Sequence, residues 1–289
     1  MSRIRLSPWL APVLLAGVYV GLTGLERRFP LRKPVEPKAA RHARNLAVAV
    51  LSAATVNLVE RPLVDRLAAA IERRRWGLLQ RVGAPQWIDA VLALALMDYT
   101  LYLWHILTHR VPWLWRMHAM HHIDRDLDVS TALRFHFAEM AASVPWRALQ
   151  VAVLGVGPRP LALWRAATLL SVLFHHSNLR LPIAVERRLS RIIVTPRLHG
   201  IHHSIVPEET ASNWSSGLTL WDRLHGTLRV DVPQREIVIG VPAFRGRRDV
   251  RLASLLKLPF VRQPPAWRLP DGRVPRRPPG RHAADRLAA

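Results

Sequence analysis

The chain has 289 residues, enough for one or two domains, and its lack of cysteine excludes disulfides, thiolate metal sites, iron–sulfur clusters and cysteine nucleophiles. Half of the residues are apolar, yet the formal net charge is +22. A soluble nucleic-acid-binding protein can be this basic but rarely has long apolar runs, so a membrane protein with arginines beside anionic headgroups is favoured and nucleic-acid binding is not expected.

The N-terminal part contains two apolar runs. The first, 6–25, has arginines on both sides and is long enough to span a hydrocarbon core of roughly 30 Å. No small-x-small cleavage site follows it, which favours a membrane helix over a signal peptide. The second run, 45–59, is shorter and contains Asn57, so it either spans the membrane or lies shallow in it.

An arginine-rich stretch and a third run follow. Leu63, Leu67 and Ile71 recur at helical spacing between 60 and 82, which predicts a helix in the membrane interface. The third run, 87–107, leads into the first histidines.

Two further apolar runs, 141–156 and 161–174, are separated by Gly-Pro-Arg-Pro, a strong turn signal. They predict a hairpin that enters the membrane and returns. Arg147 and Arg165 interrupt the pair, so contact with the membrane is better supported than full spanning.

Beyond Phe244 the chain is rich in arginine and proline, which predicts a disordered, lipid-facing basic tail that is dispensable for chemistry from about Leu258 onward. We therefore divide the chain into N-terminal membrane and interfacial helices (1–86), a catalytic membrane domain (87–230) and the tail (231–289). The predicted fold is an all-α integral membrane protein with about four or five membrane-embedded helices and a histidine-rich helical cap.

Ten of the 14 histidines fall in tight groups, and three of these groups have helical spacing that puts the imidazoles on one face. The three motifs are His105 and His109; His118, His121 and His122; and His199, His202 and His203. The pair His175–His176 lies between the last two motifs, and His136 stands alone.

Metal coordination explains these motifs better than a structural role does, because buried neutral imidazoles are costly unless their nitrogens are used. One zinc ion takes about three or four ligands, so the eight histidines of the three motifs indicate two ions. Imidazole suits iron, copper and zinc alike, and the His-Glu-x-x-His motif of zinc proteases is absent, so the motifs alone do not name the metal.

Six segments resemble the fatty acid hydroxylase/sterol desaturase superfamily of membrane di-iron enzymes, over about residues 87–230. The three main segments are 98–109, 115–122 and 195–204; the supporting ones are 130–136, 176–178 and 221–227. The resemblance implies a helical membrane domain with two irons near the cytoplasmic surface and O2 as co-substrate. It implies ten metal ligands: His105, His109, His118, His121, His122, His136, His176, His199, His202 and His203.

Phe137 stands where many members have proline beside the histidine that corresponds to His136. His176 matches better than its neighbour His175, and His225 is interpreted as structural. His42 and His282 are interpreted as loop and tail residues. Candidate catalytic residues that would orient the ligands are Asp98, Asn178, Asn213 and Asp222, with Glu139 as a further candidate. Each has a structural alternative, such as a helix cap for Asp222 or a turn for Asn213.

The expected reaction is hydroxylation or desaturation of a membrane lipid, because cleaving an unactivated C–H bond requires an oxidant that no side chain supplies. Fatty acyl chains, sterols, carotenoids, ether lipids and hopanoids all remain open as substrates. No haem motif, cluster cysteine or dinucleotide fingerprint is present, so a separate electron donor is expected, with the basic surface as a docking site.

Arg110, Arg116 and Arg125 place the histidines on the cytoplasmic face, which fits a bacterial inner membrane. If every apolar run spans the membrane, successive loops alternate between its two sides, and the arginine-rich residues 61–86 would then lie outside the cytoplasm. This conflicts with the preference of positive residues for the cytoplasmic side, and the conflict stays open. Two rivals remain. A histidine-rich metal-binding or transport protein would need ionisable residues along its spans, and an inactive scaffold would not need intact motifs.

Overall fold

The computed structural model describes residues 10–277, with side chains from residue 13 onward. The start of the first predicted run, His282 and the end of the predicted tail lie outside these residues. Within them the chain is helical, with isolated β-bridges and no strand. The all-α prediction is therefore confirmed.

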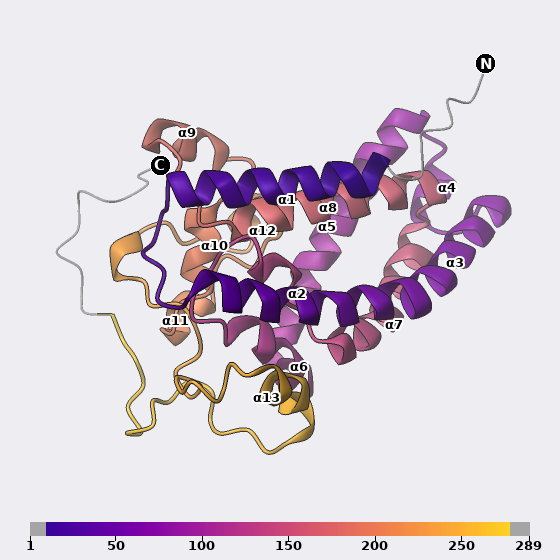
Figure 1. The fold of residues 1–289 in the computed structure, drawn as a ribbon. Coiled ribbons are helices and arrows are strands. Elements are labelled where there is room, and N and C mark those ends of the chain that lie inside the picture. The colour runs from indigo at the N-terminus through magenta and orange to yellow at the C-terminus, as the bar shows by residue number, and fades with distance from the viewer. Residues whose placement is uncertain (1–9, 278–289) are drawn as a thin grey trace.

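Three N-terminal helices form one side of the molecule. In Figure 1, α1 (Leu10–Arg28) and α2 (Lys38–Thr55) run across the front, and α2 continues through a π-helical turn (Val56–Glu60) into α3 (Arg61–Arg74). His42 thus lies in α2 rather than in a loop, which corrects its interpretation as a loop residue.

The apolar stripe of α3 packs inside the protein. Val64, Ala68 and Ile71, at most 1% exposed, contact buried residues of the next helices, whereas Leu63 is 52% exposed. Leu63 thus faces outward while this buried stripe faces the interior, and the position of the helix in the membrane interface stays a prediction. The buried face follows the i, i+4, i+7 pattern from Val64 because α3 packs on α7 and α8.

Four helices build the centre of the fold: α5 (Gln86–Arg110), α6 (Pro112–His122), α7 (Phe137–Leu154) and α8 (Pro158–His176). The predicted hairpin is present as α7 and α8, because Gly155 ends α7 with a φ of 76° and Pro158 begins α8. Gly77 packs on this turn, and a Cβ at Gly77 would lie 2.4 Å from Gly155 Cα, so both positions require glycine.

Short helices and loops cover the end of this bundle that carries the histidines: α9 (Ile183–Leu189), α10 (Pro196–His202), α11 (Pro207–Thr210), α12 (Leu220–Leu224) and α13 (Leu252–Lys257). The short α4 (Leu78–Val82) lies at the other end, beside the turn between α7 and α8 (Figure 1). Of the short helices, α10 supplies two histidines of the third motif, and Thr195 caps its N-terminus by accepting from Leu198 N.

The C-terminal segment is not a disordered tail as far as Arg277. Val250, Leu255 and Leu258 are buried in a cluster with Ala119 and Met120 of α6. In Figure 1 the yellow segment around α13 lies beside α6. The prediction of disorder from proline content is wrong here because the apolar residues between the prolines have a partner surface.

Removing everything after Lys257 should therefore destabilise the histidine site. Arg116 of α6 donates to the carbonyl oxygens of Pro259 and Val261, at 3.0 and 2.7 Å. We expect the truncated protein to lose bound metal and to unfold at lower temperature, as measured by metal analysis and thermal unfolding in detergent. Arg273→Gln, at an exposed tail arginine, is the matched control and should retain both; equal metal content in the truncation would contradict this packing role.

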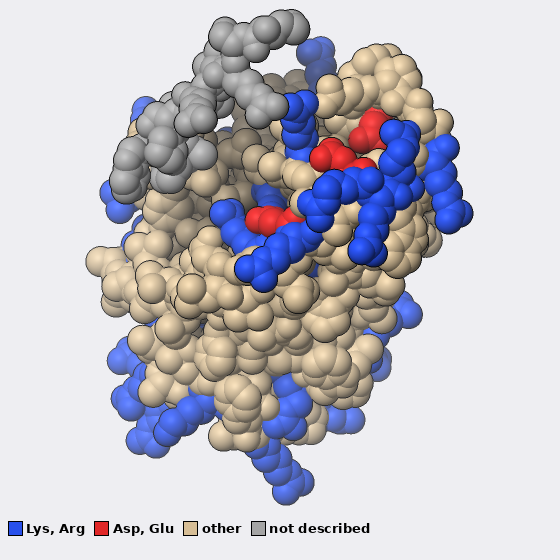
Figure 2. Space-filling view, turned by 90° about the vertical axis from the view of Figure 1, so that its right-hand side faces the viewer, with Lys and Arg blue, Asp and Glu red and all other residues tan. Residues whose placement is uncertain are grey.

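Among the described residues, two helical stretches are long and apolar enough to cross a membrane: 38–82 and α5. Apolar side chains also face outward on other helices, among them Val20 of α1, Val153 of α7 and Leu163 of α8, all more than half exposed. On the face shown in Figure 2, the centre is largely tan, and Lys and Arg lie mainly around it. Large exposed apolar surfaces of this kind mark contact with lipid or protein.

Candidate metal centre

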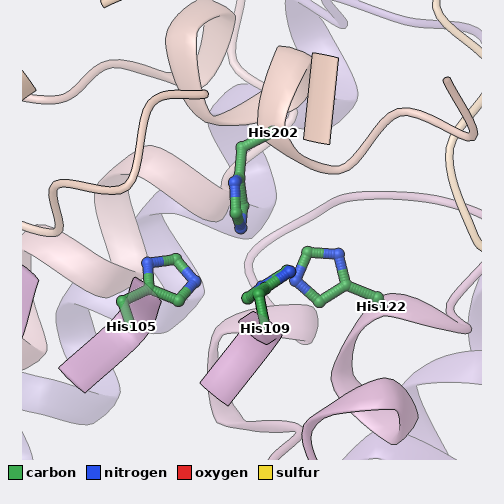
Figure 3. Close-up of side chains that lie close together, drawn as sticks. All are labelled: His105, His109, His122 and His202. Atoms are coloured by element: carbon green, nitrogen blue, oxygen red, sulfur yellow. The ribbon is translucent and has the colours of Figure 1, made fainter. Parts of the chain in front are cut away.

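Seven histidines of the three sequence motifs meet His176 at the core of the fold and form two groups of four histidines. The first quartet is His105, His109, His122 and His202; the second quartet is His121, His176, His199 and His203. In each quartet one nitrogen of every ring lies within 4.8 Å of the others. Figure 3 shows the first quartet, in which the rings from α5, α6 and α10 point toward one another. Each quartet thus mixes residues from different motifs.

The nitrogens of the second quartet are as close as ligands of one ion. The Nε2 atom of His176 is 3.0 Å from those of His121 and His199, and His199 Nε2 is 3.0 Å from His203 Nε2. Two imidazole nitrogens bound at right angles to one metal, each at about 2.1 Å, are about 3.0 Å apart. The distances between the Nε2 atoms of the second quartet therefore fit the binding of one metal ion.

Main-chain carbonyl oxygens fix the orientation of several rings. His105 Nδ1 donates to Trp214 O (2.7 Å), His176 Nδ1 to Val172 O (2.8 Å) and His202 Nδ1 to Ser212 O (2.9 Å). In a neutral imidazole this places the proton on Nδ1 and leaves the Nε2 lone pair facing the quartet. Metal-ligating histidines are oriented in this way.

Burial keeps these imidazoles neutral. It lowers the pKa of His202 to about 3, and burial together with neighbouring imidazoles holds the pKa of His122 and His203 well below the usual value. The Nε2 atoms of His109 and His202 and both ring nitrogens of His122 are buried without a hydrogen-bond partner. Neutral, unpaired nitrogens at this density are costly in a protein interior, and metal ions satisfy them.

Two other histidines lie beside the quartets, His118 and His175. His118 lies between the quartets, with its ring 4.9 Å from His109 and 5.2 Å from His121. Its Nδ1 donates to Glu139 (2.9 Å), and its Nε2 is buried without a partner. The ring of His175 is 4.1 Å from His199, outside both quartets.

The structure does not bring His136 to either quartet. His136 caps α7, since its Nδ1 accepts from Ala138 N, and its Nε2 donates to Leu256 O at 3.1 Å. Both ring nitrogens therefore bond to the main chain. The sequence match could not reveal this, because the partner Leu256 lies 120 residues away.

Two of the predicted orienting carboxylates hold the loop that contains Trp214. Asp222 accepts from Trp214 N and Ser215 N, at 2.9 and 3.0 Å, and so fixes the carbonyl that binds His105. Asp98 accepts from Leu218 N and from the Trp221 indole. Neither carboxylate belongs to a quartet; both act through the loop 214–222.

The two predicted asparagines position neighbouring segments. Asn178 bonds twice to the main chain of Arg32, at 2.9 and 2.7 Å, which ties the segment after α1 to the end of α8. Asn213 adopts a φ of 52°, and its side chain bonds to the main chain of Leu198 and Arg229. It thus holds α10 in place and also forms the turn that was its structural alternative.

Sequence reasoning missed a buried ion network behind the second motif. Arg41 of α2 is 1% exposed and binds both carboxylate oxygens of Asp124, each at 2.9 Å, and also Asp128. Arg134 lies 3.6 Å from Asp124. The alternating aspartates after His122 were a sequence signal for this network, but their partner on α2 is more than 80 residues away.

A cavity of about 220 Å³ adjoins the quartets. Its lining includes His105 and His118, His121 and His176, and the apolar side chains of Leu101, Trp104, Phe135, Met140 and Val172. An apolar cavity that reaches buried histidines suits a segment of a hydrocarbon chain better than a whole lipid, because sites for drug-sized ligands are about 300–1,000 Å³.

Comparison with known proteins finds relatives that are named as hydroxylases or monooxygenases. Residues 90–227 match the family described as fatty acid hydroxylase. An ornithine lipid hydroxylase of Rhizobium tropici is 36% identical over 180 residues, 62% of this chain and 52% of that protein. Alkylglycerol monooxygenase of Xenopus tropicalis is 31% identical over 143 residues (50% and 30%), and cholesterol 25-hydroxylase of Mus musculus 27% over 141 (48% and 46%). The chain spans about half or less of each relative. No solved structure matches it.

The fold and the site define a class: all-helical proteins with two buried histidine quartets of the metal-binding type beside an apolar cavity. The family match relates this structural class to a named family. Residues 90–227 match the fatty acid hydroxylase family, and this match supports the resemblance of the histidine motifs to the fatty acid hydroxylase/sterol desaturase superfamily.

Proposed function

We propose that this protein is an integral-membrane, O2-dependent di-iron oxidoreductase that hydroxylates a C–H bond of a membrane lipid. The observation that supports this most is the pair of histidine quartets beside an apolar cavity. The relatives named for lipid hydroxylation or monooxygenation support hydroxylation over metal storage or transport. Desaturation uses the same site and is the second candidate reaction.

We assign one ion to each quartet. His118, between the quartets with an unpaired Nε2, is the ninth ligand, and His136 is left out of the set because both of its nitrogens bond to the main chain. Two bound irons would supply the redox chemistry that activates O2 and that side chains lack.

The protein's own groups act around these ions. The carbonyl oxygens of Trp214, Val172 and Ser212 hold the Nδ1 protons of their histidines, and Glu139 holds that of His118. Leu101, Trp104 and Met140 form an apolar wall that excludes water and aligns a methylene chain with the histidines. Because the chain has no cysteine and shows no dinucleotide motif, an external reductase or redox carrier would deliver electrons.

We further propose that the membrane is a bacterial inner membrane and that the quartets face the cytoplasm. The arginines after α5 and α6 support this orientation, since positive residues favour the cytoplasmic side. A reporter fused after Arg277 tests it, and a periplasmic signal from that fusion would contradict the orientation.

Metal analysis tests the proposal directly. We expect about two iron atoms per chain after anaerobic purification from membranes, because eight neutral imidazoles in two quartets exceed what one ion binds. Chelation should remove the iron together with lipid oxidation, and ferrous iron should restore both. A single zinc per chain, with oxidation insensitive to iron chelation, would overturn the di-iron assignment.

A further inference from the structure

The cavity beside the quartets has a charged end that hydrocarbon oxidation does not require. Away from the histidines, its lining includes Glu60, Ser143, Arg147 and Thr168. Glu60 is the last residue of the π-helical turn between α2 and α3. Such turns are frequent at functional sites, and this one brings a carboxylate to the wall of the cavity.

Arg147 is held rigidly in this wall. It is 9% exposed, its guanidinium lies 4.2 Å above the Trp164 ring, and it donates to Gln150. Gln150 in turn donates to Thr100. The Nε atom of Arg147 is buried and has no hydrogen-bond acceptor. A buried guanidinium with an unused N–H is a ready donor for an anionic ligand.

Glu60 does not neutralise this end of the cavity. Its Oε1 is 3.9 Å from Arg147 Nε, beyond hydrogen-bond distance, and 3.4 Å from Arg165 Nη2, so two guanidinium groups share one carboxylate. Asp65, the other partner of Arg165, is on the surface with its side chain 54% exposed and is screened by solvent. Arg147 is therefore left without a carboxylate within hydrogen-bond distance at this end of the cavity.

Helix α7 sets the distance from this charge to the metal site. Glu139, which holds His118, and Ser143 and Arg147 follow at intervals of four, so they share the face of α7 that lines the cavity. Eight residues of helix separate Glu139 from Arg147 by about 12 Å. Between them lie apolar side chains such as Met140 and Val172.

We propose that Arg147 binds an anionic oxygen group of the lipid, a carboxylate or a phosphate, and thereby presents a carbon about 12 Å from that group to the quartets. Arg147 is then the residue that determines substrate class and the position that is oxidised. This inference rests on the proposed lipid hydroxylation, but the binding step is separable from the chemistry.

The test measures binding of three ligands with equal chains to the full-length protein in neutral detergent: palmitate, hexadecyl phosphate and methyl palmitate. We expect the native protein to bind at least one anionic ligand about tenfold or more tightly than the ester. Arg147→Gln should abolish this preference without weakening ester binding. Arg147→Lys, which keeps the charge but not the planar fork, should retain part of it. The comparison of palmitate with hexadecyl phosphate shows whether the anionic group of the bound lipid is a carboxylate or a phosphate.

Arg165→Gln is the matched control, because Arg165 also pairs with Glu60 but does not line the cavity. It should retain the preference, and the metal content of each variant reports whether the site is intact. Equal affinity of the native protein for all three ligands would overturn the inference, even if Arg147→Gln fails to fold. An Arg147→Gln protein that keeps its metal and its preference would overturn it too. A preference that depends on Arg147 without lipid oxidation would instead support the inference and contradict the proposed function.

Discussion

His202→Ala is expected to remove the ion of the first quartet and to reduce lipid oxidation by more than about 100-fold. His202 is fully buried, its Nδ1 is fixed by Ser212 O, and its Nε2 has no other partner. Removing it leaves three neutral imidazoles to bind the ion. Metal content per chain should fall from about two to about one, and product formation with the isolated protein and an artificial electron donor measures the loss.

The control for His202→Ala is His225→Ala. His225 also packs among aromatic rings, with Tyr99 and Tyr102, but it belongs to neither quartet. This variant should keep both ions and most of the activity. If His202→Ala keeps full metal content and turnover, or if both variants lose them equally, the quartet assignment is wrong.

The second large effect is expected at Arg41, far from any ligand in sequence. Arg41→Ala leaves Asp124 buried at 0% exposure with the more distant guanidinium groups of Arg134 and Arg44, at 3.6 and 3.8 Å, and breaking a buried ion pair in this way costs about 3–5 kcal/mol. The free energy of unfolding in detergent should fall by about this amount. Because Asp124 lies two residues after His122 of the second motif, metal retention should fall as well.

Arg229→Ala, at a solvent-exposed ion pair, is the comparison for Arg41→Ala. Arg229 Nε lies 3.2 Å from Asp231 Oδ1, and the two side chains are 30% and 56% exposed. Such a pair contributes about 1 kcal/mol or less, because solvent screens it and the long side chain loses entropy on pairing. Similar stability losses in the two variants would show that the network around Asp124 is not a buried clamp.

The fold class and most of the ligand positions follow from local patterns. The spacing of His105 and His109, and of the other two motifs, places imidazoles on one helical face whatever the tertiary structure. The turn between α7 and α8 likewise follows from glycine and proline chemistry. These features depend on residues within a few positions of one another.

Which histidines share an ion depends on how the helices pack. The second motif is divided between the quartets, with His122 in one and His121 in the other, because neighbouring helical residues point in directions about 100° apart. The position of His136 was likewise set by packing, since its Nε2 bonds to Leu256 in the segment that the sequence predicted to be disordered.

The sequence by itself determined that this protein is helical, rich in apolar runs and equipped with histidine groups that could bind metal, because composition and periodicity are properties of neighbouring residues. Only the tertiary structure decided the composition of each quartet, the carbonyl oxygens that fix their rings, the burial of Arg41 and the charged end of the cavity at Arg147. All of these are contacts between segments far apart in the chain, and a linear pattern does not specify which surfaces pack together.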